Sequence, residues 1–133
     1  MSDNGVPAFA GAPSCYGVAM PRLTTHVLDT TSGKPAAGLH VVLRRGDEPA
    51  ILAEALTNAD GRLDRPLLEG ADFTPGTYEL TFHVGDYFRA QKQATADPAF
   101  LDLVPVRFGL AGGRDYHVPL LIQPYGYSTY RGS

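Results

Sequence analysis

Turn-forming residues divide the chain from Arg22 onward into a regular series of short apolar runs. Glycine, proline, aspartate or asparagine closes each run, which is the pattern of strands joined by turns. Seven or eight short strands favour an all-β sandwich of two sheets. The strands are expected at residues 23–28, 39–44, 51–57, 77–84, 104–110, 116–122 and 127–131.

One short helix is expected at residues 86–93. Asp86 can cap its first turn, and Tyr87, Phe88 and Gln91 recur at helical spacing. In the strand before it, alternation places Tyr78, Leu80, Phe82 and Val84 inward and Glu79, Thr81 and His83 outward. We therefore expect His83, and by the same alternation His40, to be solvated surface residues.

The composition excludes several classes of protein. The 133 residues, of which 44% are hydrophobic, are expected to form one domain with a genuine core. A formal net charge of −3 provides no basic surface for nucleic acid or an anionic membrane. A single cysteine, Cys15, excludes an intrachain disulfide and is compatible with the reducing cytoplasm. The expected partner is a small polar molecule or a protein.

Residues 1–20 differ in composition from the rest of the chain. They are rich in glycine, alanine and proline, with no positively charged start and no unbroken apolar stretch, so they do not resemble a signal peptide. No run in the chain approaches the roughly 20 apolar residues of a membrane helix. We expect a disordered leader at residues 1–20 and a folded domain at residues 21–133.

The strand at residues 116–122 has two apolar faces. Tyr116, Val118, Leu120 and Ile122 alternate with His117, Pro119 and Leu121. Since one face of a sheet in a small β protein normally meets water, the second apolar face predicts contact with another subunit, with His117 inside it. The alternative is a core or interface histidine that a neighbour satisfies.

A second histidine lies on a mixed face of the strand at residues 23–28. Leu23, Thr25 and Val27 alternate there with Thr24, His26 and Leu28. If the two strands meet, His26 and His117 supply imidazoles that titrate near neutral pH and can exchange protons with a substrate. A zinc site at the two histidines is disfavoured, because no third ligand stands at a recognisable spacing.

Two further segments carry candidate site residues. Arg62 follows the tight reversal at Asp60 and Gly61, and its planar guanidinium can grip an oxygen anion with two hydrogen bonds. Its alternative is an exposed turn arginine. Arg44 and Arg45 compete for the functional role, although Arg44 falls on the His40 face and is expected to be solvated. The chain ends in aromatic, hydroxylic and cationic residues, which predicts a terminus that is docked rather than frayed.

These segments together resemble the 5-hydroxyisourate hydrolases, the transthyretin-like enzymes of urate breakdown. The resemblance covers residues 23–133. The matching segments are residues 25–29, 33–36, 60–62, 85–88 and 117–121, followed by the terminal Tyr130, Arg131, Gly132 and Ser133. The terminal tetrapeptide is the most specific of them, whereas turns such as Asp60, Gly61 and Arg62 occur in many β proteins.

The resemblance implies a transthyretin-like sandwich of seven to eight strands with one short helix, assembled as a homotetramer with its active sites at the dimer–dimer interface. It implies a catalytic set of four residues: His26, Arg62, His117 and Ser133. It places His26, Arg62, Tyr130 and Arg131 beside the substrate, and it requires no cofactor or metal. Ser133 is interpreted as a positioning group, because no Ser-His-Asp arrangement is evident.

The implied reaction is the hydrolysis of 5-hydroxyisourate to 2-oxo-4-hydroxy-4-carboxy-5-ureidoimidazoline in purine catabolism. One imidazole removes a proton from water while Arg62 stabilises the developing oxyanion, and the sequence leaves open whether His26 or His117 is the base. The alternative function is a non-catalytic carrier of small ligands of the transthyretin type. The paired histidines and the terminal tetrapeptide disfavour it.

Overall fold

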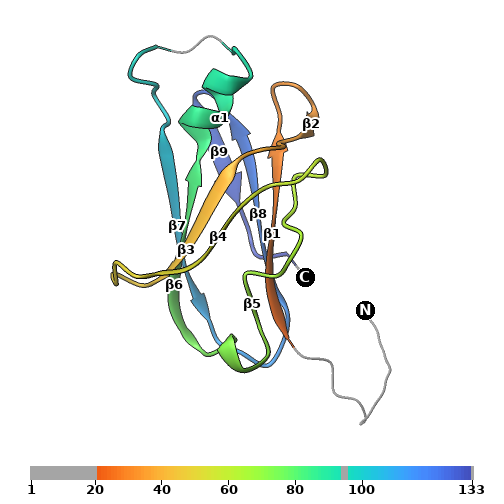
Figure 1. The fold of residues 1–133 in the computed structure, drawn as a ribbon, viewed down its shortest axis with the longest axis vertical. Helices are drawn as coiled ribbons and strands as arrows, with labels where there is room; N and C mark the ends of the chain where they lie inside the picture. Colours follow the sequence, from red (N-terminus) through yellow and green to blue (C-terminus); the bar gives the residue numbers. More distant parts are fainter. Residues whose placement is uncertain (1–20, 94–95, 133) are drawn as a thin grey trace.

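Two β-sheets face each other in a sandwich (Figure 1). The structure, a computed structural model, describes residues 21–93 and 96–132. One sheet has the strand order β2-β1-β8-β9, with β5 also paired to β1, and the other has the order β4-β3-β6-β7. In chain order the strands are β1 (Arg22–Asp29), β2 (Lys34–Pro35), β3 (His40–Arg45), β4 (Ile51–Leu56), β5 (Leu68–Glu69), β6 (Gly76–His83), β7 (Leu103–Leu110), β8 (Tyr116–Gln123) and β9 (Gly126–Thr129).

The predicted two-sheet sandwich is confirmed. Each of the seven expected strands is present, with both ends within two residues of the expected ones. The two-residue strands β2 and β5, and the single turn of 3-10 helix at Gly70–Asp72, were not expected. Elements of two or three residues are too short to leave a periodic pattern in a sequence.

The core lies between the two sheets and follows the alternation of the strands. Leu23 and Val27 on β1 and Leu120 and Ile122 on β8 are fully buried, and they face Leu80 and other side chains of the second sheet. Because alternation sends every second residue outward, the face of β1 and β8 that carries His26 and His117 is left for other contacts.

The parallel pairing of β1 with β8 brings together the two strands that carry these histidines. Thr24 lies opposite His117, and His26 lies opposite Pro119. The pairing joins residues 93 positions apart in the sequence. β9 then pairs antiparallel with the other edge of β8, which brings the end of the chain to the same sheet.

The helix α1 (Val84–Ala90) begins two residues earlier and ends three residues earlier than expected. Its N-cap residue is His83, so the expected capping role of Asp86 is wrong. β6 continues directly into the helix, and a side chain on Gly85 would collide with Asp102. Tertiary contact therefore decides where the helix starts.

The expectation that His40 and His83 are solvated is wrong. They are half-buried, because β3 and β6 are neighbours and the two imidazoles stack with a centroid distance of 4.4 Å. Glu54 contacts His40 at 2.7 Å, and Asp86 lies 3.8 Å from His83. Thr81, also expected to point into solvent, is buried.

The expected leader at residues 1–20, with Cys15, lies outside the described residues. Within the described part of the chain, no helix is long and apolar enough to cross a membrane.

Candidate active site

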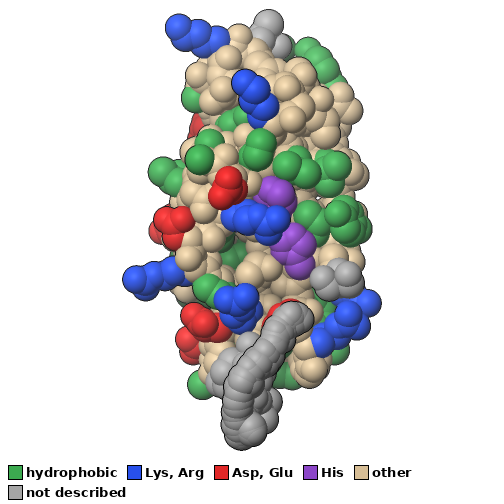
Figure 2. All heavy atoms as spheres, turned by 90° about the vertical axis from the view of Figure 1, so that its right-hand side faces the viewer, with side chains coloured by type: hydrophobic (Ala, Val, Ile, Leu, Met, Phe, Trp, Pro, Cys, Tyr) green, Lys and Arg blue, Asp and Glu red, His purple; other side chains and the backbone are tan. Residues whose placement is uncertain are grey.

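Two histidine side chains and a cationic side chain lie together near the middle of one face of the molecule (Figure 2). This is the outer face of the sheet that contains β1 and β8. His26 comes from β1, His117 from β8, and Arg62 from the loop that follows β4. Because β1 and β8 are paired neighbours and His26 acts electrostatically on His117, the expected convergence of the two histidines is present within a single chain.

A tight turn at residues 58–62 delivers Arg62 to this face. The side-chain oxygen of Asn58 accepts hydrogen bonds from the backbone N–H groups of Asp60 (2.9 Å) and Arg62 (3.1 Å). The turn docks on β1, where the N–H of Val27 donates to the carbonyl of Gly61 at 2.8 Å and His26 forms a β-bridge with Arg62. Arg62 is thus fixed at its backbone.

Gly61 allows this close docking. Its φ is +75°, and a Cβ there would lie 2.3 Å from the carbonyl oxygen of Val27. Only glycine combines the left-handed conformation with so short an approach of two backbones. The aspartate–glycine pair that predicted the turn is therefore also required for the contact that carries Arg62.

The same turn holds the ring of His26. Its Nε2 lies 2.8 Å from the backbone carbonyl oxygen of Asp60. A carbonyl only accepts, so Nε2 carries the proton and donates it to Asp60. In the neutral imidazole the remaining nitrogen, Nδ1, has the free lone pair.

His117 is held differently. The hydroxyl oxygen of Thr24 lies 2.8 Å from its Nδ1, and Gly132 pairs with its backbone through an N–H···O bond of 2.7 Å. Burial lowers the pKa of His117 below its usual value, and the positive charge of Arg62 lowers it further, as does His26 when both of its ring nitrogens carry a proton. At neutral pH this imidazole is therefore neutral and able to accept a proton.

The end of the chain contributes one more side chain to this face. In the antiparallel register of β8 with β9, which the His117–Gly132 bridge extends, Tyr130 lies opposite Pro119 and Arg131 opposite Val118. Residues opposite each other point to the same side of a sheet, so Tyr130 shares the face of His117. Arg131 points to the other side, with its guanidinium carbon 5.9 Å from the ring centroid of Tyr116.

The predicted set is therefore only partly assembled by a single chain. His26, Arg62, His117 and Tyr130 share one face, and Arg131 does not join them. Ser133 lies outside the described residues. The catalytic and substrate-binding roles of all six residues stay predictions.

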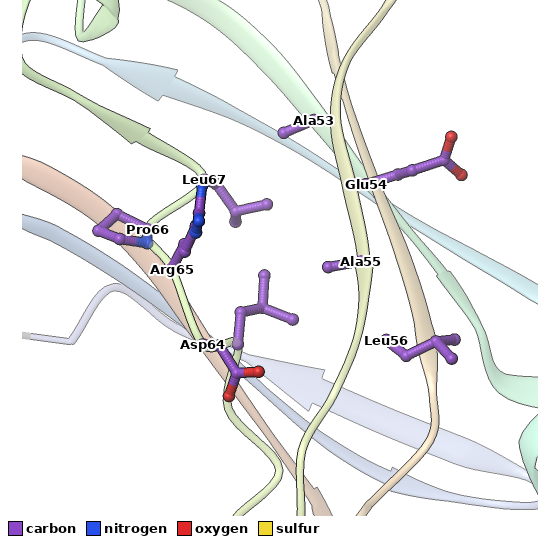
Figure 3. Close-up of a pocket in the computed structure, with 9 residues that line it drawn as sticks. Ala53, Glu54, Ala55, Leu56, Asp64, Arg65, Pro66 and Leu67 are labelled. Carbon is purple, nitrogen blue, oxygen red and sulfur yellow. The ribbon is translucent and has the colours of Figure 1, made fainter.

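A cavity of about 270 Å³ adjoins the site between β1 and the loop that follows Arg62. Thr24 and Arg62 line it together with the exposed Arg22 and Arg65. A second cavity, of about 390 Å³, lies between β4 and residues 63–67 (Figure 3). Alanine and leucine side chains form much of its lining. Of the two cavities, the first is the one lined by Arg62 and by Thr24, whose hydroxyl contacts His117.

Metal ligands do not cluster in the described part of the chain. Residues 21–93 and 96–132 contain no group of three or more His, Cys, Asp or Glu side chains placed to hold an ion. The site chemistry that these residues offer is proton transfer by imidazole and charge stabilisation by guanidinium.

Sequence reasoning did not identify three supporting groups: the hydroxyl of Thr24, the carbonyl of Asp60 and the backbone of Gly132. Alternation placed Thr24 on the His26 face, but no local signal shows which strand lies beside β1. Asp60 and Gly132 contribute backbone atoms, and every residue has these, so the identity of the residue does not indicate the role.

Fold and site together define a transthyretin-like sandwich with two histidines and an arginine gathered on the outer face of one sheet. The chain belongs to the HIUase/Transthyretin family, whose model matches residues 23–132.

Individual relatives agree with this membership. The chain is 61% identical to 5-hydroxyisourate hydrolase 2 of Rhizobium meliloti over 115 residues, which cover 84% of this chain and 96% of the relative. The structure of Klebsiella pneumoniae 5-hydroxyisourate hydrolase matches with a TM-score of 0.73 and 36% identity, covering 85% of this chain and 99% of the other. A crystal structure of (S)-allantoin synthase matches with a TM-score of 0.82 and 45% identity over 86% of this chain and 44% of that longer one.

We expect Gly61→Ala to reduce both stability and activity more than Gly33→Ala does. Both glycines have a φ of +75°, so alanine at either position meets a similar backbone strain of about 1–2 kcal/mol. A Cβ at Gly33 meets nothing within 4 Å, whereas one at Gly61 collides with the backbone of β1. Urea denaturation and initial rates of both variants test this, and equal losses would contradict the docking role of Gly61.

Proposed function

We infer that this chain is an enzyme that hydrolyses 5-hydroxyisourate. The observation that carries the inference is the convergence of two imidazoles and one guanidinium on a single sheet face, in a chain 61% identical to a protein named for this hydrolysis. The reaction opens a ring by adding water, so it needs a group that takes a proton from the water and a group that stabilises the carbonyl oxygen. An imidazole supplies the first, and the guanidinium supplies the second.

His117 is the general base of this proposal. Its neutral imidazole, with Nδ1 engaged by Thr24, takes a proton from water at Nε2. The water oxygen bonds to the ring carbonyl carbon, and the carbonyl oxygen becomes an oxyanion. The C–N bond of the ring then breaks, and the leaving nitrogen takes a proton from the imidazolium. The products are a ureido group and a carboxylic acid, which releases the second proton of the water to solvent and becomes a carboxylate.

Arg62 and His26 act on the other side of the carbonyl. The guanidinium of Arg62 stabilises the oxyanion with parallel hydrogen bonds, which a lysine cannot reproduce. His26, with Nε2 committed to Asp60, offers Nδ1 as an acceptor for a substrate N–H. This division leaves one histidine for proton transfer and the other for binding.

The proposal extends to the assembly. The faces of β1 and β8 that carry the histidines also expose half-buried Leu28 and Leu121, which fits a contact between subunits. We propose a homotetramer with the sites at the dimer–dimer interface, where Tyr130 and Ser133 complete the pocket. The guanidinium of Arg131 points to the other side of the sheet, toward Tyr116, so it is not placed in this pocket. We also propose a cytoplasmic protein of purine catabolism that needs no cofactor.

A carrier of the transthyretin type is the second candidate. It shares the fold and would bind a small ligand without turning it over. The lowered pKa of His117 near Arg62 favours catalysis, because a neutral base close to a cation serves a reaction that develops negative charge. The carrier predicts saturable binding with no product.

The activity is tested by ultraviolet monitoring of freshly generated 5-hydroxyisourate with and without the protein, since the uncatalysed decay is its own baseline. We expect His117→Ala to lower turnover by about 10²–10⁴-fold, the range for loss of a general base. Size-exclusion chromatography of the same samples checks that the assembly is intact. If 5-hydroxyisourate decays no faster with the intact wild-type protein than in buffer alone, the proposed hydrolase activity is excluded.

Arg62→Lys keeps the positive charge and removes the planar fork. We expect kcat/KM to fall at least about tenfold, on the order of 1.4 kcal/mol of transition-state stabilisation. The matched control is Arg44→Lys, because Arg44 lies on the other sheet and only its Nε contacts a backbone carbonyl, that of Pro49, at 3.3 Å. If both substitutions lower kcat/KM equally and only slightly, Arg62 is an ordinary turn residue with no role in catalysis.

The pH dependence follows from the lowered pKa of His117. Activity is lost on acidification when this base is protonated, so the midpoint of the acidic limb of kcat/KM lies below about 6.5, the ordinary value for histidine. Arg62→Gln removes one positive charge that lowers this pKa, so the midpoint moves to higher pH. Arg44→Gln leaves it unchanged. A midpoint above 6.5 in the wild type would contradict His117 as the base.

A further inference from the structure

Thr24 and His117 are direct neighbours across the parallel strands β1 and β8. The hydroxyl oxygen of Thr24 lies 2.8 Å from Nδ1 of the imidazole, and the pair is partly buried. In the described part of the chain this ring nitrogen is the only hydrogen-bond partner that the Thr24 hydroxyl has. The contact is therefore specific to His117.

The two flanks of the His117 ring are fixed by different groups. Nδ1 and Cδ2 are the two ring atoms bonded to Cγ, so together they define how the ring is rotated. Thr24 holds the Nδ1 flank. On the other flank a Cβ built on Gly132 would lie 2.9 Å from Cδ2, so the backbone of Gly132 closely backs that edge. The distal atoms Cε1 and Nε2 are left to meet the substrate.

We propose that Thr24 is the positioning residue of His117: it accepts a hydrogen bond from Nδ1–H and thereby presents the lone pair of Nε2 to the attacking water. The proposal rests on the proposed hydrolysis and adds a residue to it. A flipped ring would place Cδ2 against the hydroxyl and lose the bond, so Thr24 selects the rotation of the ring. A hydroxyl can donate or accept, and the proposal assigns it the acceptor role, which corresponds to the Nδ1–H tautomer of the base.

A hydroxyl suits this position because it is neutral. When His117 takes a proton at Nε2, Nδ1 must keep its hydrogen, and the threonine oxygen accepts it in both protonation states. A carboxylate in the same place would stabilise the imidazolium and make the ring a stronger base that holds its proton. Thr24 therefore orients the ring without slowing the return of the proton to the leaving nitrogen.

The other groups near His117 act on its charge rather than its orientation. His26 on β1 and Arg62 in the turn at residues 58–62 both oppose its protonation. Tyr130, beyond the end of β9, shares its face. Thr24 is the one described side chain that hydrogen-bonds the ring.

The test compares three variants in the full-length protein. Thr24→Val removes the hydroxyl at nearly constant volume, Thr24→Ser restores it, and Thr25→Val is the matched control. Thr25 is the next residue on β1, but it faces the core, where its hydroxyl donates to the carbonyl of Val118 at 2.7 Å. We expect Thr24→Val to lower kcat at least tenfold with less than a threefold change in KM, Thr24→Ser to recover most of the rate, and Thr25→Val to leave kcat unchanged.

Two further readouts separate positioning from a structural role. Imidazole ¹⁵N shifts of the wild type at neutral pH are expected to show His117 protonated at Nδ1, and Thr24→Val is expected to shift the population toward Nε2–H. Thr24→Asp is expected to move the acidic limb of the pH profile to higher pH. Wild-type His117 in the Nε2–H form, or a kcat for Thr24→Val within twofold of the wild type, would overturn the proposal.

The outcome is distinguishable from failure of the proposed function. If the wild-type protein does not accelerate the decay of 5-hydroxyisourate, the hydrolysis is excluded, and the ¹⁵N shifts still decide whether Thr24 sets the tautomer. If the wild type is active and Thr24→Val does not fold, the proposal is decided by two other measurements. These are the imidazole ¹⁵N shifts of wild-type His117 and the pH profile of Thr24→Asp.

Discussion

The parallel pairing of β1 with β8 is the interaction on which the rest of the structure depends. It buries the inner residues of both strands between the sheets and fixes the register of their outer residues at the same time. Because side chains alternate with period two, a shift of one residue would send the histidines into the core and the apolar residues outward. The hydrophobic core and the position of the candidate base are therefore set by one register.

The backbone does as much for this site as the side chains do. Gly61 lets a turn approach β1 closely enough to pin His26 and deliver Arg62, and Gly132 backs the ring of His117. These contacts connect a loop and the end of the chain to the two most buried strands of the sheet. A site assembled in this way is tied by backbone hydrogen bonds to strands that also form the core.

Electrostatics then gives the two imidazoles different roles. Partial burial and the nearby positive charges keep His117 neutral, whereas His26 has Nε2 bound to a backbone carbonyl. Two chemically identical side chains thus differ in which nitrogen is available. A guanidinium near a neutral imidazole matches a reaction that starts from neutral water and develops an anion.

The sequence by itself determined the strands, the inward faces and the candidates His26, Arg62 and His117, because alternation and turn chemistry are local properties of the chain. Only the tertiary structure decided that Thr24 lies beside His117, that Arg131 points away from it, and that His40 stacks on His83. It also moved the start of the helix to Val84, where Asp102 packs closely against Gly85. Each of these depends on which strand or loop becomes a neighbour across a long stretch of sequence, and a local pattern carries no information about a partner 93 residues away.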